Sequence, residues 1–499
     1  MSRGLGDVYK RQIRFIVEAL DWLVIGVFFL ALIGIIVWVV RQKQNDSADY
    51  FLGGRDATWL AIGASIFASN IGSEHLIGLA GAGASSGMAM AHWEIQGWMI
   101  LILGWVFVPF YTRSMVYTMP EFLERRYNPQ SRTILSVISL VSYVLTKVAV
   151  TVYAGGLVFQ QVFGIKELWG IDFFWIAAIG LVVLTALYTI FGGMKSVLYT
   201  SVLQTPILLL GSLIILVLGF KELGGWDEMM RVCGAVTVND YGDTMTNLIR
   251  SNDDANFPWL GALIGSAIIG FWYWCTDQFI VQRVLSGKNE MEARRGTIFG
   301  AYLKLLPVFL FLIPGMIAFA LHQKYIGAGG EGFLPMLENG TANADAAFPT
   351  LVAKLLPAGV KGLVVCGILA ALMSSLASLF NSSAMLFTID FYKRFRPQTS
   401  EKKLVGIGQV ATVVIVILGI LWIPIMRSVG DVLYTYLQDV QSVLAPGIAA
   451  AFLLGICWKR TSAQGGMWGL ISGMVIGLTR LGAKVYYSNA GAVSYTHLR

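Results

Sequence analysis

Long apolar segments alternate with short polar ones along almost the whole chain. A helix needs about 20 apolar residues to cross the hydrocarbon core of a bilayer, which is about 30 Å thick. The pattern predicts twelve such helices, over residues 19–41, 59–85, 88–112, 133–163, 172–191, 197–220, 259–283, 297–322, 361–391, 404–426, 431–458 and 465–482. We therefore expect an all-α membrane protein whose spans form a single transmembrane domain over residues 13–491.

Composition supports this class. Of the 499 residues, 56% are hydrophobic and only 13% are charged, about half the charged fraction of a soluble domain. The four cysteines have no metal-ligand spacing, and the sequence contains neither a phosphate-binding GxxxxGK loop nor an HExxH motif. These absences argue against an enzyme, and the basic charge is interpreted as cytoplasmic loops rather than as a nucleic-acid surface.

The loops between the predicted spans differ in positive charge. Alternate loops that begin with the one after residue 41 hold 19 Lys and Arg residues, and the other set holds 8. Because positive loops face the cytoplasm, we expect the N-terminus outside, at the plasma or inner membrane. Residues 1–12 and 492–499 resemble non-native tails, and an outside end after twelve spans is compatible with a truncated C-terminus.

The second predicted span has a polar centre, formed by Asn70, Gly72, Ser73, Glu74 and His75. A carboxylate and an amide at mid-membrane are costly, but they are tolerated where a helix unwinds beside a cavity. The alternative is that the glycines only allow close helix packing. The combination with polar groups favours an interrupted helix.

The seventh predicted span repeats this theme five spans later. It holds Gly261, Gly265, Ser266 and Gly270, followed by the aromatic run 272–274. Interrupted helices at corresponding places in two halves indicate an inverted-repeat transporter with a site at the midplane. This spacing predicts two repeats of five spans, over 59–220 and 259–458, with 19–41 and 465–482 as extra spans.

The ninth predicted span carries small and hydroxyl side chains on one helical face: Ala371, Ser374, Ser375, Ser378 and Ser382. Serines in a membrane helix often bond back to their own backbone. Alternatively, hydroxyls combined with unwound backbone carbonyls form a site for an alkali cation. Both explanations remain open at this point.

Four polar side chains lie inside other spans: Glu94, Lys147, Lys304 and Gln438. Ionisable groups in a membrane indicate either structural pairing or a functional site. A carboxylate, an ammonium and an amide suit a hydroxyl-rich ligand, because each hydroxyl both donates and accepts. Neighbouring aromatic residues could stack on such a ligand. The sequence does not assign a role to Lys147.

These motifs resemble the sodium/solute symporter family, and most closely its sodium/glucose cotransporter branch, from about residue 48 to 477. The segments that carry the resemblance are 48–55 (ADYFLGGR), 68–75 (ASNIGSEH), 117–127 (YTMPEFLERRY), 272–283 (WYWCTDQFIVQR) and 374–382 (SSLASLFNS). The resemblance implies a five-plus-five inverted-repeat fold with discontinuous helices and sodium as the coupling ion. No other cofactor is expected.

The resemblance also implies roles for single residues. Sodium would be held by backbone carbonyls of Ala68, Ile71 and Ala371 with the hydroxyls of Ser374 and Ser375. A second set would bind the solute, with His75, Glu94, Lys304 and Gln438 as direct contacts and Asn70 behind the broken helix. The inner gate would be Tyr273, and the outer gate would comprise Leu79, Trp93 and Tyr434.

Two positions depart from the family pattern. Gly270 replaces an amide or hydroxyl that contacts the sugar in relatives, and Ser201 replaces a carboxylate at a second sodium site. The expected activity is therefore uptake of a sugar-like neutral solute with one sodium ion. The alternatives are another solute, such as inositol, a carboxylate or sialic acid, or a sugar sensor that does not transport. The oligomeric state is not indicated.

Overall fold

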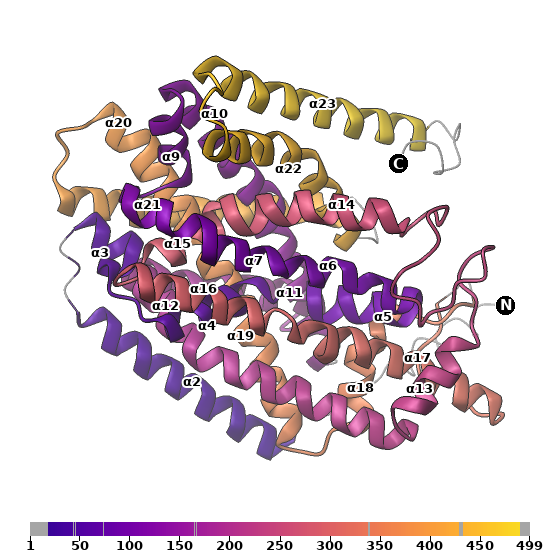
Figure 1. The fold of residues 1–499 in the computed structure, drawn as a ribbon. Helices are drawn as coiled ribbons and strands as arrows, with labels where there is room; N and C mark the ends of the chain where they lie inside the picture. The colour runs from indigo at the N-terminus through magenta and orange to yellow at the C-terminus, as the bar shows by residue number, and fades with distance from the viewer. Residues whose placement is uncertain are drawn as a thin grey trace.

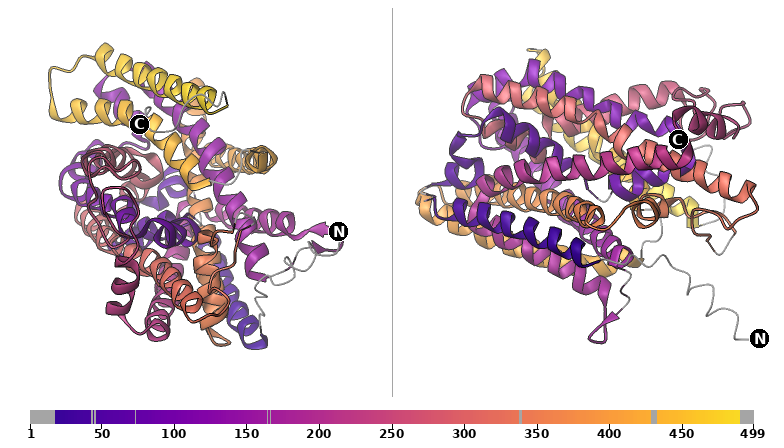
Figure 2. Two further views of the ribbon diagram at one scale, coloured as in Figure 1. Left: turned by 90° about the vertical axis from the view of Figure 1, so that its right-hand side faces the viewer. Right: turned by 90° about the horizontal axis from the view of Figure 1, so that it is seen from below.

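The computed structural model describes residues 18–42, 44, 46–72, 74–163, 165, 167–337, 340–428 and 433–489, and it is built almost entirely from helices. The helices lie roughly along one direction in an elongated bundle (Figures 1 and 2). One antiparallel hairpin, β1 (Glu167–Leu168) and β2 (Ile171–Asp172), joins two of them. The predicted tails and Ser73 lie outside the described residues.

The first half of the chain contains the helices that lead to and from the first polar segment. They are α2 (Ala19–Val40), α3 (Ser47–Leu52), η2 (Gly53–Arg55), α4 (Trp59–Asn70), η3 (Glu74–Leu79), α5 (Ala80–Ser86), η4 (Gly87–Ala91), α6 (His92–Ile95), η5 (Gln96–Trp98), α7 (Met99–Ile102), η6 (Leu103–Phe107), α8 (Val108–Ser114), α9 (Met119–Arg126), α10 (Pro129–Ser142), η7 (Tyr143–Val148), α11 (Ala149–Phe163), α12 (Phe173–Leu223) and α13 (Trp226–Gly234).

The second half begins after a long polar loop. Its helices are α14 (Trp259–Gly270), η8 (Phe271–Thr276), α15 (Gln278–Leu285), α16 (Glu290–Leu303), η9 (Val308–Leu312), α17 (Ile313–Gly327), η10 (Ala344–Ala346), α18 (Ala347–Leu355), α19 (Val360–Met385), η11 (Leu386–Tyr392), α20 (Lys393–Phe395), α21 (Glu401–Ser428), α22 (Leu433–Cys457) and α23 (Ala463–Asn489).

Two spans are interrupted, but the second interruption lies later than the glycines suggested. The first follows α4, where Ile71 is extended, with φ −83° and ψ 112°. In the seventh span the glycine-containing stretch is helical throughout α14, and the chain continues as a π-helix, η8. The backbone becomes extended at Asp277, with φ −73° and ψ 129°, before α15. The aromatic run therefore precedes the break directly.

The fifth and sixth predicted spans meet without a loop. Both belong to α12, within which Gly193 alone leaves helical geometry, with φ 54° and ψ −147°. A Cβ atom on Gly193 would lie 2.4 Å from the carbonyl oxygen of Tyr50. Glycine thus permits both the left-handed backbone and the close approach of α3 to this turn.

The described residues contain seven helical segments that are long and apolar enough to cross a membrane, together with shorter apolar helices such as α4. Part of the difference between these seven segments and the twelve predicted spans arises because an interrupted span is divided into helices that are each too short to cross a membrane. The described structure thus confirms a helical membrane protein, while the number of spans stays a prediction.

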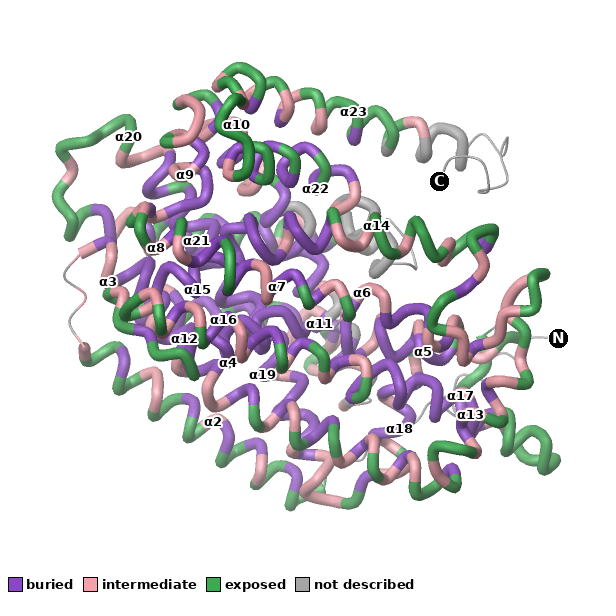
Figure 3. The backbone as a smooth tube through the Cα atoms, viewed as in Figure 1, coloured by how far each residue is buried: buried purple, intermediate pink, exposed green. Residues whose placement is uncertain are grey.

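The core centres on α19, which is buried along nearly its whole length and packs against α4, α11, α12 and α21. Exposure rises toward α2 and α23, which lie at opposite edges of the bundle (Figure 3). Asp21 anchors α2 to this core, because its buried carboxylate accepts from Gly359 N and Gly362 N at 2.7 Å each. A carboxylate at this helix N-terminus satisfies two amides that lack helical acceptors.

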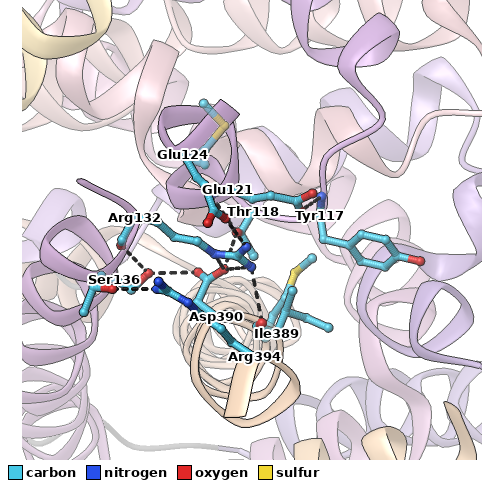
Figure 4. A network of polar contacts seen from close by, with 12 residues as sticks. Tyr117, Thr118, Glu121, Glu124, Arg132, Ser136, Ile389, Asp390 and Arg394 are labelled. Atoms are coloured by element: carbon cyan, nitrogen blue, oxygen red, sulfur yellow. Dashed lines mark hydrogen bonds and ion pairs between the residues drawn. The ribbon is translucent and has the colours of Figure 1, made fainter. Parts of the chain in front are cut away.

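An ionic cluster fixes the other end of this central segment (Figure 4). The fully buried carboxylate of Asp390, on η11, lies 2.6 Å from Arg132 Nη2 of α10. Thr118 and Ser136 donate to the same carboxylate at 2.8 and 3.0 Å, and Arg132 also pairs with Glu124 at 2.6 Å. The cluster therefore joins three segments at the face predicted to be cytoplasmic.

This cluster predicts that Arg132→Met lowers the stability of the protein. The substitution leaves the Asp390 carboxylate buried without its cation, which costs about 3 kcal/mol or more. Arg125→Met is the control, since the Arg125 side chain is 51% exposed and its pair with Glu121 contributes at most about 1 kcal/mol. Thermal unfolding in detergent should show a much larger fall in Tm for Arg132→Met, and equal shifts would contradict the assignment.

Candidate functional site

The end of α4 leaves backbone carbonyl groups without helical partners in the middle of the bundle. The helix α4 ends at Asn70, and the next described helix, η3, begins at Glu74. The Ile71 amide still donates to Phe67 O, and the Gly72 carbonyl accepts from His75 N and Leu76 N, but the end of a helix leaves its last carbonyls without the regular amide donors of the following turn. Because lipid supplies no water, these carbonyls need partners from another segment.

The serine face of α19 provides such partners. The Ser375 hydroxyl donates to the Ser69 carbonyl at 2.8 Å and lies 3.3 Å from the Ile71 carbonyl. Ser374 Oγ lies 3.2 Å from the hydroxyl of Ser201 on α12. Hydroxyls from two helices thus converge on the broken end of a third.

The remaining serines of this face make both kinds of contact considered from the sequence: some bond to their own helix, and some contact other segments. Ser378 donates to the carbonyl of Ser374, in its own helix, at 2.7 Å, and its hydroxyl also lies 2.9 Å from Ser69 Oγ. Ser382 donates instead to Gln282 Oε1 of α15 at 2.7 Å. The face therefore contacts α4 near the break and α15 below it.

The structure brings most of the predicted sodium ligands to this junction. Ile71 and Ser375 are in contact, and Ser374 belongs to the same turn of α19 as Ser375. Ala68 and Ala371 are each 1% exposed on the two facing helices. The available ligands are hydroxyl and carbonyl oxygens, which suit an alkali cation. The complete ligand set stays a prediction.

Three of the predicted solute-binding residues form one buried ionic group. Lys304 Nζ lies 2.6 Å from Glu94 Oε2, and His75 Nε2 lies 3.2 Å from Glu94 Oε1. The Lys304 ammonium also lies 2.9 Å from His75 Nε2. The three side chains come from α6, η3 and the end of α16, and none is more than 7% exposed. They place donors and acceptors within one small region.

One predicted gate residue, Tyr273, contacts the end of the first broken helix. The side-chain amide of Asn70 donates to the Tyr273 hydroxyl at 3.0 Å, so the two broken helices meet there. Leu79 is buried and Trp93 is half-buried. Tyr434 and Gln438 belong to α22, but their side chains lie outside the described residues.

Lys147 acquires a partner that the sequence analysis did not assign. Its ammonium lies 2.6 Å from the carboxylate of Asp277, at the second helix break. The same carboxylate accepts from the Tyr143 hydroxyl and from the Phe279 amide. The ammonium also lies 4.7 Å from the centre of the Tyr273 ring. A search for an acid of complementary sign within other spans would have found Asp277.

The two departures from the family pattern have local consequences. A Cβ atom on Gly270 would lie 2.9 Å from Gln96 Oε1, so a longer side chain there would displace Gln96. Ser201 is fully buried and bonds only to hydroxyl and carbonyl groups in the contacts the structure records. Neither position supplies a carboxylate.

Comparisons with known proteins place this geometry in context. A model of the sodium:solute symporter family matches residues 50–473. The human sodium/myo-inositol cotransporter 2 is 38% identical over 475 residues, which cover 92% of this chain and 69% of that protein. The zebrafish (Danio rerio) sodium/glucose cotransporter 4 is 37% identical over 491 residues, covering 95% and 73%.

Solved structures show the same fold at low sequence identity. A sodium-coupled sialic acid symporter in a substrate-bound outward-open state superposes with a TM-score of 0.75 at 21% identity, covering 92% of this chain and 97% of that one. MhsT in complex with L-phenylalanine gives a TM-score of 0.53 at 11% identity, covering 88% and 99%. With the family match and the inositol and glucose cotransporter relatives, these findings show that the chain belongs to the sodium:solute symporter family.

Proposed function

We propose that this protein carries a neutral, hydroxyl-rich solute into the cell together with sodium. The observation that carries the proposal is the contact of Ser375 with the broken end of α4, which assembles hydroxyl and carbonyl oxygens without a carboxylate. Family membership supports sodium as the coupling ion. Uptake of radiolabelled solute by proteoliposomes with an imposed sodium gradient tests it.

The solute class is proposed from the ionic group around Glu94. Its carboxylate would repel an anion, whereas a ring hydroxyl could donate to Glu94 and accept from Lys304. Relatives named for myo-inositol and for glucose transport both handle neutral ring compounds with several hydroxyls. We therefore favour a sugar or a cyclic polyol over a carboxylate or sialic acid.

The finer architecture is proposed on the same basis. Two interrupted spans, at Ile71 and at Asp277, lie five predicted spans apart, as an inverted repeat requires. Residues 59–220 and 259–458 would form the two repeats, with 19–41 and 465–482 outside them. The N-terminus would face outward from the plasma or inner membrane.

The transport cycle would be alternating access with one sodium ion per solute. Sodium would tie α4 to α19, solute would bind near Glu94, and Tyr273 would move to open the inner side. One charge that crosses 100 mV releases about 2.3 kcal/mol, and a tenfold sodium gradient adds about 1.4 kcal/mol. Together these could support roughly 500-fold accumulation, so one ion is sufficient.

Ser375→Ala should weaken sodium binding. The substitution removes a hydroxyl that touches the broken end of α4, and loss of one such ligand should raise the sodium concentration for half-maximal uptake about tenfold. Ser382→Ala is the control, because Ser382 bonds to Gln282 away from the break. Unchanged sodium dependence in Ser375→Ala would contradict the site.

Glu94→Gln should weaken solute binding more than sodium binding. Hydrogen bonds to a charged group contribute about 1.5–3 kcal/mol, so the KM for solute should rise between about tenfold and a hundredfold. Initial uptake rates across solute and sodium concentrations separate the two effects, with Glu167→Gln, at an exposed position of β1, as a control. Equal effects on both affinities would count against direct solute contact.

Lys147→Met should increase solute leakage. The ammonium holds Asp277 and contacts the Tyr273 ring, and loss of a buried cation–π contact of about 1–2 kcal/mol corresponds to about a fivefold to thirtyfold change. Efflux of preloaded solute into sodium-free buffer should rise by that factor, while Lys147→Arg should stay closer to the parent protein. Efflux at the parent rate from folded Lys147→Met would exclude a role in closing the inner gate.

A further inference from the structure

Arg283 is a buried cation beside the broken end of α4. It lies on α15, and its side chain is among the largest that are fully enclosed, at 1% exposure. Its Nε–H is directed at two hydroxyls of α4, Ser65 Oγ and Ser69 Oγ, each 3.1 Å away. The guanidinium thus contacts the helix that supplies carbonyls to the proposed sodium site.

The charge of Arg283 lacks the compensation that a buried guanidinium normally has. Burying a charge is costly unless a carboxylate or several acceptors surround it. Among the described residues, Nη1 and Nη2 of Arg283 have no hydrogen-bond partner and no acid lies within ion-pairing distance. The ring of Phe279, whose centre is 4.9 Å from Arg283 Cζ, offers only a weak cation–π contact.

The acid closest in sequence is already engaged. Asp277 interacts electrostatically with Arg283, but its carboxylate directly binds the Lys147 ammonium and accepts from Phe279 N. Lys147 Nζ lies 5.0 Å from the centre of the Phe279 ring, so both cations contact the same ring. Glu74 also interacts electrostatically with Lys147, so Lys147 faces two carboxylates, whereas Arg283 has no direct carboxylate contact among the described residues.

The Arg283 guanidinium connects to the proposed sodium ligands through two short chains of contacts. Ser69 accepts from Arg283 through its hydroxyl and from Ser375 through its backbone carbonyl. The hydroxyl of Ser65, the other contact of Arg283, lies 3.5 Å from Ser201 Oγ, which in turn lies 3.2 Å from Ser374 Oγ. No carboxylate belongs to either chain of contacts, so neither screens sodium from the guanidinium.

We propose that Arg283 is a tethered cation that weakens the binding of sodium and so promotes its release to the cytoplasm. The inference rests on the proposed sodium site. Like charges repel strongly where water is scarce, and at an effective dielectric constant of about 20 a unit charge even about 12 Å away is worth about a tenfold change in affinity. Arg283 acts on the ion through space and is a positioning residue, not a sodium ligand.

Neutralising Arg283 should therefore strengthen sodium binding, a direction that structural damage would not produce. Arg283→Gln should lower the half-saturating sodium concentration about tenfold and make sodium inside the vesicles a stronger inhibitor of uptake. Arg283→Lys keeps the charge and should remain close to the parent protein. Lys195→Gln is the matched control, because it removes one cation that contacts Gln42 and not the serines.

A titratable substitution separates charge from shape within one folded protein. Arg283→His should bind sodium more tightly as pH rises through about 6.5, where a histidine loses its charge. Comparison with the parent protein at each pH removes the pH effects that the two proteins share. Sodium binding is read both from uptake and from the sodium-induced rise in Tm without solute.

The outcomes distinguish this inference from the proposed function. Sodium affinity that falls or stays the same in folded Arg283→Gln would overturn it, as would an Arg283→His protein whose sodium affinity follows the parent at every pH. If the parent protein itself shows neither sodium-dependent uptake nor a sodium-induced change in Tm, the proposed function fails instead.

Discussion

The contact between the broken end of α4 and the serine face of α19 is the constraint on which the rest of the structure depends. In an apolar medium, carbonyls released from a helix must find donors or a cation. Ser375 meets this need for Ser69 and Ile71 through one hydroxyl. The same oxygens that complete the fold are therefore those that we propose as sodium ligands. Separating α4 from α19 exposes these oxygens, which links ion occupancy to helix movement.

Much of this arrangement could be predicted from the sequence. The polar residues from Asn70 to His75 interrupt an apolar segment, and the residue spacing from Ala371 to Ser382 defines one helical face. These local patterns identified the first break and the hydroxyl row. The complementary charges of Glu94 and Lys304 suggested a pair, which is present at 2.6 Å. Each of these features is encoded within one segment or by charge alone.

The parts that could not be predicted depend on register between distant segments. Glycines at 261–270 suggested a break, but α14 remains helical and the backbone departs from helical geometry at Asp277. The partner of Lys147 is 130 residues away, and Arg283 reaches Ser65 across 218 residues. No periodicity within a segment encodes such pairings. The serine pattern likewise did not reveal that Ser375 would contact the Ser69 carbonyl.

The buried charges suggest how coupling arises without tight ion binding. Asp390 and Asp277 each have a close cation, in Arg132 and Lys147, so these acids stabilise the scaffold and are not available to sodium. The proposed sodium ligands are neutral oxygens, and the Arg283 guanidinium lies nearby without a direct carboxylate contact. Such a site would bind sodium loosely and exchange it quickly. Because the site exists only while α4 touches α19, sodium binding would be coupled to the movement of these helices. Geometry, more than affinity, would then determine when sodium binds and when it leaves.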